Sequence, residues 1–255
     1  MELQVIYEDE DVLVVDKPAG IIVFPAAPEG EPSQGREEAI AEKTLIDFLL
    51  EKFPYLKQVG QFPRHGIVHR LDKETSGILL VAKHNKSLKF LQKKFKERGV
   101  LKKYAALLIG DLKPNQGKIE TLIGRSPRDR KKQRVFSFTD PQAQKKGMRN
   151  AITEYKVLEK FSINNREPYT LVEAIPRTGR KHQLRCHFSY LGHPIVGDKV
   201  YGFKKQPAPE KLNRHFLHAS YLRIELPGGK SKEFKSYLPK DLGEVLEQLK
   251  LKSKK

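Results

Sequence analysis

The segment HRLDKETSG at residues 69–77, followed at once by the apolar run ILLVA at 78–82, decides how this sequence folds. A short apolar segment at 66–68 precedes it, so the pattern predicts two strands joined by a polar loop. The loop holds the carboxylate of Asp72 between two cationic side chains. Such an aspartate is typical of a surface turn or an ion pair, and it is also a residue that acts as a nucleophile or a base. Asp72 is therefore the first candidate for chemistry.

A second polar segment, TGRKHQLRCH at residues 178–187, follows later in the chain. Its apolar side chains have helical spacing and predict a helix that ends at Gly192. A separate, polar face of this helix carries His182 and Arg185. A cationic helix that closes over the loop of Asp72 would suit a carboxylate acting on an anionic substrate.

The overall charge indicates a polyanionic partner. The 255 residues carry a formal net charge of +18, and such an excess of Lys and Arg recruits phosphate backbones through counterion release. Nucleic acid is the first candidate. A membrane is not expected, because the sequence contains no secretory signal, no lipidation motif and no apolar run near the ~20 residues that span a bilayer.

The cysteine and histidine content argues against a metal site or a bound cofactor. Cys186 is the single cysteine, which excludes an internal disulfide and favours a reducing, cytoplasmic setting. His182 and His187 are five residues apart, so they lie about 140° apart on an ideal helix. Phosphate-binding loops of the Gly-x-x-x-x-Gly-Lys and Gly-x-Gly-x-x-Gly types do not occur. We therefore expect no metal and no small-molecule cofactor.

Strand-like segments outnumber helical ones along the chain. This pattern predicts an α+β fold with a largely antiparallel, mixed central sheet flanked by helices and loops. We expect one domain over 1–248, a mobile loop at 26–44 and a basic, disordered tail at 249–255. The expected strands lie in a hairpin within 4–15 and at 21–24, 66–68, 78–82, 103–109, 117–123, 150–159, 169–175, 217–226 and 232–238. One expected helix lies at 45–53, and a second runs from a cap at Asn85 to just before Gly99. A third ends at Gly192, and a fourth begins at a capping box formed by Asp241 and Glu244.

A cluster of cations, RSPRDRKKQR at residues 125–134, falls in a predicted hairpin loop. A solvated, flexible loop is one interpretation. Contact with RNA is the other, because so much local positive charge is costly to hold without an anion. We take four side chains of the cluster as candidate RNA contacts: Arg125, Arg128, Arg130 and Lys131.

Four motifs occur in order between residues 4 and 238. The first two are KP-x-G at 17–20 with Pro25, and HRLD at 69–72 with TSG at 75–77. The third is KY-x-A at 103–106 with Gly110, and the last is GR-x-HQLR-x-H at 179–187, continuing to G-x-P-I-x-GD at 192–198 and YG at 201–202. In their residues and their order, these motifs resemble those of the RluA family of RNA pseudouridine synthases.

This resemblance implies a pseudouridine synthase-like catalytic domain and an isomerase that requires no cofactor. It implies that Asp72 is the catalytic carboxylate, that Arg185 is its ion-pair partner, and that Tyr104 stacks on the target base and assists removal of a proton from carbon 5. Arg70 would support the flipping of the target uridine out of the RNA. Further RNA contacts are expected from the same motifs at His69, Arg180, His182 and Gln183.

The expected substrate is a structured RNA, either rRNA or tRNA, and the oligomeric state is left open. Two other functions stay in view. A catalytically silent RNA-binding protein would explain the charge but gives Asp72 no task. A hydrolase that uses Asp72 or Ser76 would release a product, whereas an isomerase conserves the mass of the nucleoside.

Overall fold

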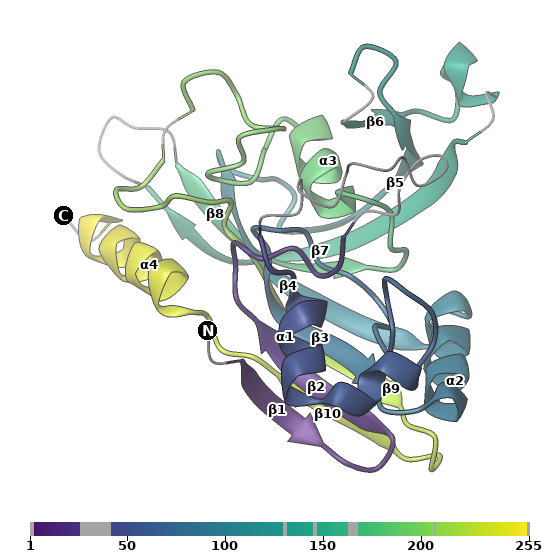
Figure 1. Cartoon of the computed structure of the whole chain (residues 1–255). Coiled ribbons are helices and arrows are strands. Elements are labelled where there is room, and N and C mark those ends of the chain that lie inside the picture. The colour runs from purple at the N-terminus through teal and green to yellow at the C-terminus, as the bar shows by residue number, and fades with distance from the viewer. Residues whose placement is uncertain are drawn as a thin grey trace. The chain divides into compact units, whose positions relative to one another are not determined.

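The computed structural model describes residues 3–25, 42–129, 132–144, 147–162, 168–206 and 208–253. Antiparallel strands form the framework and four α-helices flank them, which confirms the predicted α+β class (Figure 1). The chain divides into two compact units. Unit 1 comprises Met1–Val100 and Tyr221–Ser236, and unit 2 comprises Leu101–Ser220 and Tyr237–Lys255. Among the described residues, no helix combines the length and the apolar character needed to cross a bilayer.

Unit 1 is built on the predicted N-terminal hairpin. Strand β1 (Gln4–Glu8) pairs antiparallel with β2 (Val12–Lys17), and β2 pairs antiparallel with β3 (Ser76–Ala82). The turn forms because the carboxylate of Asp9 accepts hydrogen bonds from two backbone amides that follow it. All seven residues of β3 are buried, so this strand lies in the interior of the unit.

Helices α1 (Leu45–Lys52) and α2 (Asn85–Lys96) begin at polar caps. The amide of Thr44 donates to the Asp47 carboxylate at 2.8 Å, as in a capping box. The prediction that Asn85 caps α2 is wrong by one residue. His84 is the cap, with its ring nitrogen accepting from the amide of Ser87, because the Asn85 side chain binds the backbone of Gln58 and Gly60 in a distant loop instead.

Two expected strands do not form. The carbonyls of residues 21, 22 and 23 accept hydrogen bonds from the Lys17 ammonium and from the first two amides of α1, so they are not available to a neighbouring strand. The segment 66–68 makes only a single bridge between Ile67 and Val81. Of the loop expected at 26–44, residues 26–41 lie outside the described part of the chain.

Unit 2 contains an antiparallel sheet in the order β4-β8-β7-β5-β6. The bounds are β4 Val100–Ile109, β5 Gln116–Arg125, β6 Gln133–Phe136, β7 Arg149–Phe161 and β8 Tyr169–Pro176. Short 3-10 turns lie at Pro54–Gln58 in unit 1 and Pro141–Gln144 in unit 2. Strand β9 (Leu217–Glu225) runs through both units and forms the expected hairpin with β10 (Ser231–Lys235).

Helices α3 (Gln183–Tyr190) and α4 (Lys240–Ser253) contribute apolar side chains to the core of unit 2. Phe188 of α3 is completely buried, and Leu249 of α4 is 2% exposed. Residues 249–253, which were expected to belong to a disordered tail, form the end of α4, and Leu249 is the last residue of its buried stripe. Helix α4 begins at Lys240, so Asp241 lies inside its first turn and is not the cap that was expected; its carboxylate pairs with Arg214 at 2.7 Å.

Candidate active site

Asp72 lies in a tight turn that leads into β3. The amide of Thr75 donates to the carbonyl of Asp72 at 3.1 Å. Buried residues anchor the turn on both sides: Leu71 is 4% exposed, while Thr75 and Ser76 are each 2% exposed. The carboxylate of Asp72 itself is half-buried. The turn therefore presents one carboxylate from a fixed backbone.

A buried lysine ties this turn to another loop of unit 1. The ammonium of Lys17 is fully buried and donates to the carbonyls of Pro18, Ile21 and Lys73 at 2.9, 2.8 and 3.0 Å. The amide of Gly20 also donates to the carbonyl of Lys73 at 2.9 Å. Since a buried ammonium is stable only when its donors are satisfied, these bonds hold the two loops together.

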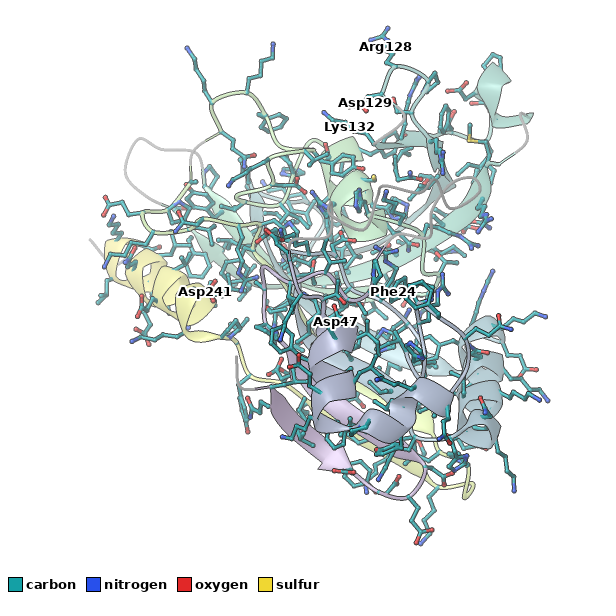
Figure 2. All side chains as sticks on the ribbon, viewed as in Figure 1. Phe24, Asp47, Arg128, Asp129, Lys132 and Asp241 are labelled. Carbon is teal, nitrogen blue, oxygen red and sulfur yellow. The ribbon has the colours of Figure 1, made fainter. Side chains whose placement is uncertain are left out.

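Arg70 lies against an aromatic ring. Its guanidinium is 5.1 Å from the centre of the Phe24 ring, and the guanidinium of Arg64 is 5.0 Å from the same ring. Phe24 is 6% exposed and is labelled in Figure 2, whereas both arginines are exposed. The ring face attracts both cations, so Arg70 is held at the surface close to a second positive charge.

His69 performs a structural task within unit 1. Its Nε2 accepts a hydrogen bond from the amide of Leu80 at 3.1 Å, and its ring stacks on Phe95 with centres 4.9 Å apart. These contacts connect the motif to β3 and to helix α2. Its predicted contact with RNA stays a prediction.

Tyr104 is on strand β4 in unit 2, opposite Ala174 of β8. It is half-buried and packs against the core cluster of the unit. Burial lowers the pKa of the neighbouring Lys102 to about 8. The ammonium of Lys103 pairs with Glu173 at 3.1 Å. Tyr104 thus projects from a fixed strand that also carries two cationic groups.

Arg185 forms a buried ion pair with Asp198. Its Nε and Nη2 donate to the two carboxylate oxygens at 2.7 and 2.9 Å. Burial by itself would raise the pKa of Asp198, but the guanidinium of Arg185 outweighs it and lowers this pKa below its usual value. Asp198 also accepts from the amides of Val200 and Tyr201. The planar guanidinium is therefore fixed in orientation.

His182 and Tyr201 connect helix α3 to strand β6. His182 has a left-handed backbone, with φ of 55°, and its Nδ1 is hydrogen-bonded to the Tyr201 hydroxyl at 2.8 Å. The same hydroxyl accepts from the amide of Gln133 at 2.9 Å. Burial raises the pKa of Tyr201, so the phenol stays neutral.

Gln183 is hydrogen-bonded within the fold, and its predicted contact with RNA stays a prediction. It is 4% exposed, and its carbonyl oxygen accepts from the Thr178 hydroxyl and from the amide of Arg180. Its amide nitrogen donates to the carbonyl of Ile152 and the hydroxyl of Thr153. Because the side chain is used inside the fold, Gln183 positions the loop that carries Arg180.

His187 and Cys186 also belong to the interior of unit 2. The imidazole of His187 is bonded to the hydroxyls of Thr121 and Thr153 at 3.0 and 2.8 Å, and burial lowers its pKa to about 4. Cys186 is 4% exposed and packs in a small cluster with Ile123. In the part of the chain that the structure describes, no group of three or more His, Cys, Asp or Glu residues could hold a metal ion.

The basic cluster forms the loop of the predicted hairpin, now seen to join β5 and β6. Arg125 and Arg128 are exposed, and Arg128 extends away from the ribbon at the loop (Figure 2). The amide of Lys132 donates to the carbonyl of Asp129 at 2.9 Å and closes the loop. The other two candidates of the cluster, Arg130 and Lys131, lie outside the described residues.

The arrangement of these motifs matches a known family. A family model described as RNA pseudouridylate synthase matches residues 11–190. The chain belongs to this family.

Similar proteins agree in sequence and in fold with the RNA pseudouridylate synthase family. An uncharacterized RNA pseudouridine synthase of Aquifex aeolicus is 39% identical over 82% of this chain, which spans 59% of that protein. Ribosomal large subunit pseudouridine synthase D of Neisseria meningitidis serogroup B is 37% identical over 99% of the chain, which spans 63% of that protein. Human RNA pseudouridylate synthase domain containing 1 superposes with a TM-score of 0.68 at 28% identity, covering 98% of this chain and 95% of that one.

The site residues of this pseudouridylate synthase chain fall into two groups. Asp72, Arg70 and His69 lie in unit 1, whereas all other described candidates lie in unit 2. The pair of Asp72 with Arg185 stays a prediction, since the two residues belong to different units. Asp198, Lys17 and Phe24 were not singled out from the sequence. A signal for Lys17 and Asp198 was present, because both are part of motifs that carry the family resemblance.

Proposed function

We propose that this protein isomerises uridine to pseudouridine in RNA, with Asp72 as the catalytic carboxylate. The reaction breaks the bond between N1 of uracil and C1′ of ribose, turns the detached base and joins its C5 to C1′. The C5 proton leaves and N1 takes up a proton, so the nucleoside keeps its mass. A carboxylate suits this chemistry because it can attack or deprotonate and can afterwards be expelled.

The observation that carries this proposal is the placement of Asp72. It stands at the aspartate of the HRLD motif, inside the segment that matches the family model, and in a turn that the buried Lys17 ammonium fixes. A reacting group held by a rigid backbone loses little freedom on reaching the transition state.

Tyr104 and Arg185 complete the proposed chemistry. We assign Tyr104 to stacking on the target base and to assisting removal of the C5 proton. Such proton removal is demanding for a phenol, because the unperturbed pKa of this group in general is near 10. We assign Arg185 to pairing with Asp72 and keeping it ionised. The bidentate contact with Asp198 supports this assignment, because it gives the Arg185 guanidinium a fixed orientation.

Arg70 is proposed to act in base flipping. A uridine stacked in RNA must leave its neighbours before its ring can be reached, and a guanidinium can occupy the vacated space. The contact with Phe24 supports this role, since it holds Arg70 at the surface without covering it.

Ribosomal RNA is the proposed substrate, with tRNA as the alternative. The names of several relatives, among them the Neisseria protein, specify the large ribosomal subunit. We also propose that the protein acts in the cytoplasm, because its single cysteine is buried and no disulfide is available to it.

Two other functions make different predictions. A silent RNA-binding protein would bind RNA and leave it unchanged. A hydrolase would release uracil or cleave the chain, and its alternative nucleophile, Ser76, is 2% exposed at the start of β3. The burial of Ser76 disfavours the version that depends on it.

The decisive experiment uses RNA labelled with tritium at C5 of uridine. Transcripts of large-subunit rRNA and of tRNA are incubated with the protein, and released tritium and pseudouridine are both measured. Equal amounts of the two, without free uracil, support the isomerase. Free uracil would identify a hydrolase, and bound but unchanged RNA would identify a silent binding protein.

A further inference from the structure

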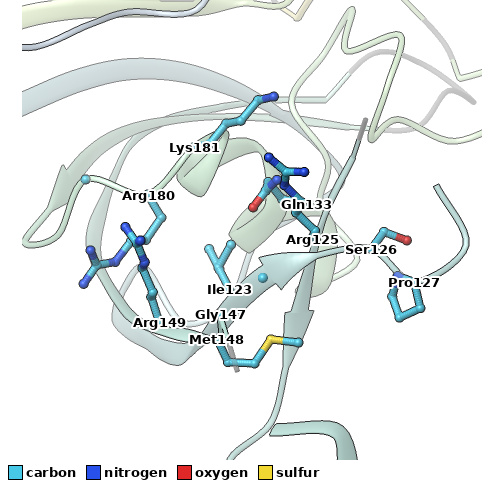
Figure 3. A pocket seen from close by; sticks show the side chains of 12 residues that line it. Ile123, Arg125, Ser126, Pro127, Gln133, Gly147, Met148, Arg149, Arg180 and Lys181 are labelled. Atoms are coloured by element: carbon cyan, nitrogen blue, oxygen red, sulfur yellow. The ribbon is translucent and has the colours of Figure 1, made fainter. Parts of the chain in front are cut away.

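An open pocket in unit 2 is not used by the proposed chemistry. Its volume is about 640 Å³, and its walls come from the end of β5, the start of β6, the residues just before β7 together with its first residue, and the turn before α3 (Figure 3). This size falls within the range of about 300–1,000 Å³ that is usual for sites that bind small molecules. The pocket is large enough for more than a single inorganic ion.

The lining of the pocket is strongly basic. Of the twelve described residues that line it, Arg125, Arg149, Arg180 and Lys181 are cationic and none is acidic. Figure 3 shows Arg149 and Arg180 next to each other on one side of the pocket. Two guanidinium groups side by side offer planar forks of donors, and a phosphate fits such donors.

The position of Arg180 is fixed before any ligand binds. Its Nε donates to the carbonyl of Asn150 at 2.9 Å, and its backbone amide is held by the buried Gln183 side chain at 2.9 Å. The opposite wall is fixed as well, because the amide of Gln133 donates to the Tyr201 hydroxyl. A site with fixed donors spends little free energy on ordering itself when it binds.

The rest of the pocket lining combines three apolar side chains with Ser126, Gln133 and glycines. Ile123 lies at its centre, with Met148 and Pro127 towards other sides (Figure 3). Met148 lies directly over Gly124, where the Cβ of any larger residue would collide with its sulfur. A flexible thioether adapts to flat rings and makes favourable contacts with them.

We propose that this pocket binds one nucleotide of single-stranded RNA outside the target uridine. Its phosphate lies between Arg149 and Arg180, and its base packs against Met148. This inference rests on the proposed function, since it adds a second contact to the same RNA. It identifies Arg149 and Met148, which no motif includes, as residues that help to hold the substrate.

Binding of a short, fluorescein-labelled oligoadenylate to the full chain tests the proposal. This RNA contains no uridine, so its affinity is independent of catalysis. Arg149→Gln is expected to weaken binding about tenfold, which is about 1.4 kcal/mol. Arg149→Lys should recover part of the loss, because it restores the charge without the fork of donors.

Arg134→Gln is the matched control. It removes the same charge from another strand of the same sheet, β6, but Arg134 lies over Phe136 and outside the pocket. A loss of threefold or less is expected for it. Equal losses for Arg149→Gln and Arg134→Gln, in proteins with unchanged melting temperatures, would overturn the proposal and leave only diffuse attraction to positive charge.

The contact with the base has its own test. Met148→Ala should weaken binding of oligoadenylate several-fold but leave the affinity for an abasic oligonucleotide of equal length unchanged. The same loss for both RNAs would refute the base contact. Tritium release from uridine-labelled RNA is measured in parallel with the wild-type protein. If the wild-type protein releases no tritium, the proposed function is wrong. The pocket is judged separately, on the oligoadenylate data alone.

Discussion

At the scale of single residues, the buried charges in this protein have specific partners. Lys17 donates to three carbonyls, and Asp198 accepts from Arg185 and two amides. Charge is costly to bury, so each of these residues stabilises one arrangement of the loops around it and penalises others. The candidate catalytic residues Asp72 and Arg185 take their positions from these supporting groups.

The first prediction concerns Asp72. Asp72→Asn keeps the shape of the side chain but removes its nucleophilic charge, so pseudouridine formation should be lost while RNA affinity changes by no more than a few-fold. Glu74→Gln, in the same loop, removes the same charge two residues away and should retain activity. Both are measured by tritium release and by RNA binding. Turnover by pure Asp72→Asn protein would exclude the proposed mechanism.

The second prediction concerns the pair of Arg185 and Asp198. Arg185→Ala leaves the Asp198 carboxylate buried without its cation, which should lower the free energy of unfolding by about 3 kcal/mol or more. The control is Arg177→Ala, which breaks an exposed pair with Glu154 and should cost less than about 1 kcal/mol. Urea unfolding at neutral pH measures both variants. Similar losses would show that Asp198 does not depend on its partner.

The third prediction concerns His187, whose pKa burial lowers from 6.5 to about 4. At a pH between these two pKa values, the unfolded chain binds a proton at this histidine that the folded protein does not bind. The free energy of unfolding therefore keeps its full value above about pH 6.5 and falls as the pH decreases. His187→Gln cannot titrate. Between pH 7 and pH 5 it should therefore lose about 2 kcal/mol less than the wild type. Urea unfolding measures both proteins at both pH values. An equal loss of unfolding free energy in the two proteins would contradict a neutral, buried His187.

At the scale of elements, regular sequence patterns predicted the strands and helices whose contacts are local. Alternation and turn residues were sufficient for the β1–β2 and β9–β10 hairpins, because their contacts are local in sequence. For the β5–β6 hairpin only the loop was predicted, and the short strand β6 was missed. The strand expected at 21–24 does not form, because its carbonyls accept hydrogen bonds from the Lys17 ammonium and from the first amides of helix α1. The contact with α1 is distant in sequence and is not visible in a local pattern. The cap at Asn85 failed similarly, because that side chain binds a distant loop.

The fourth prediction concerns the loop between β5 and β6. Replacing Arg128 and Lys132 by Ala should weaken RNA binding several-fold and reduce the log-log salt slope by about 1.4, at about 0.7 for each phosphate that is no longer neutralised. The single-turnover rate at saturating RNA should change little. Arg223→Ala with Lys230→Ala removes the same charge from the β9–β10 hairpin and serves as the control. If affinity holds and the chemical step collapses, the loop belongs to the active site.

At the scale of the whole molecule, the sequence predicted which residues are candidates for the site better than it predicted which residues they contact. Motif order identified Asp72, Tyr104 and Arg185, but no local pattern specifies that Arg185 pairs with Asp198, because that contact depends on how α3 and the chain after it pack. The division into two units was also not expected. We still propose one catalytic domain, because strand β9 runs through both units.

The fifth prediction follows from the net charge of +18. Attraction of this kind does not depend on base sequence, so target and non-target RNAs should both bind and should lose affinity together as salt rises, with a slope of about −0.7 per phosphate neutralised. Specificity then arises when a uridine is flipped, where Arg70 and Tyr104 act, so only the target should be modified even when both RNAs are saturating. Competition binding and tritium release across a salt series measure the two steps separately. If non-target RNA fails to compete at low salt, the protein selects its substrate on binding, and flipping is not the step that discriminates.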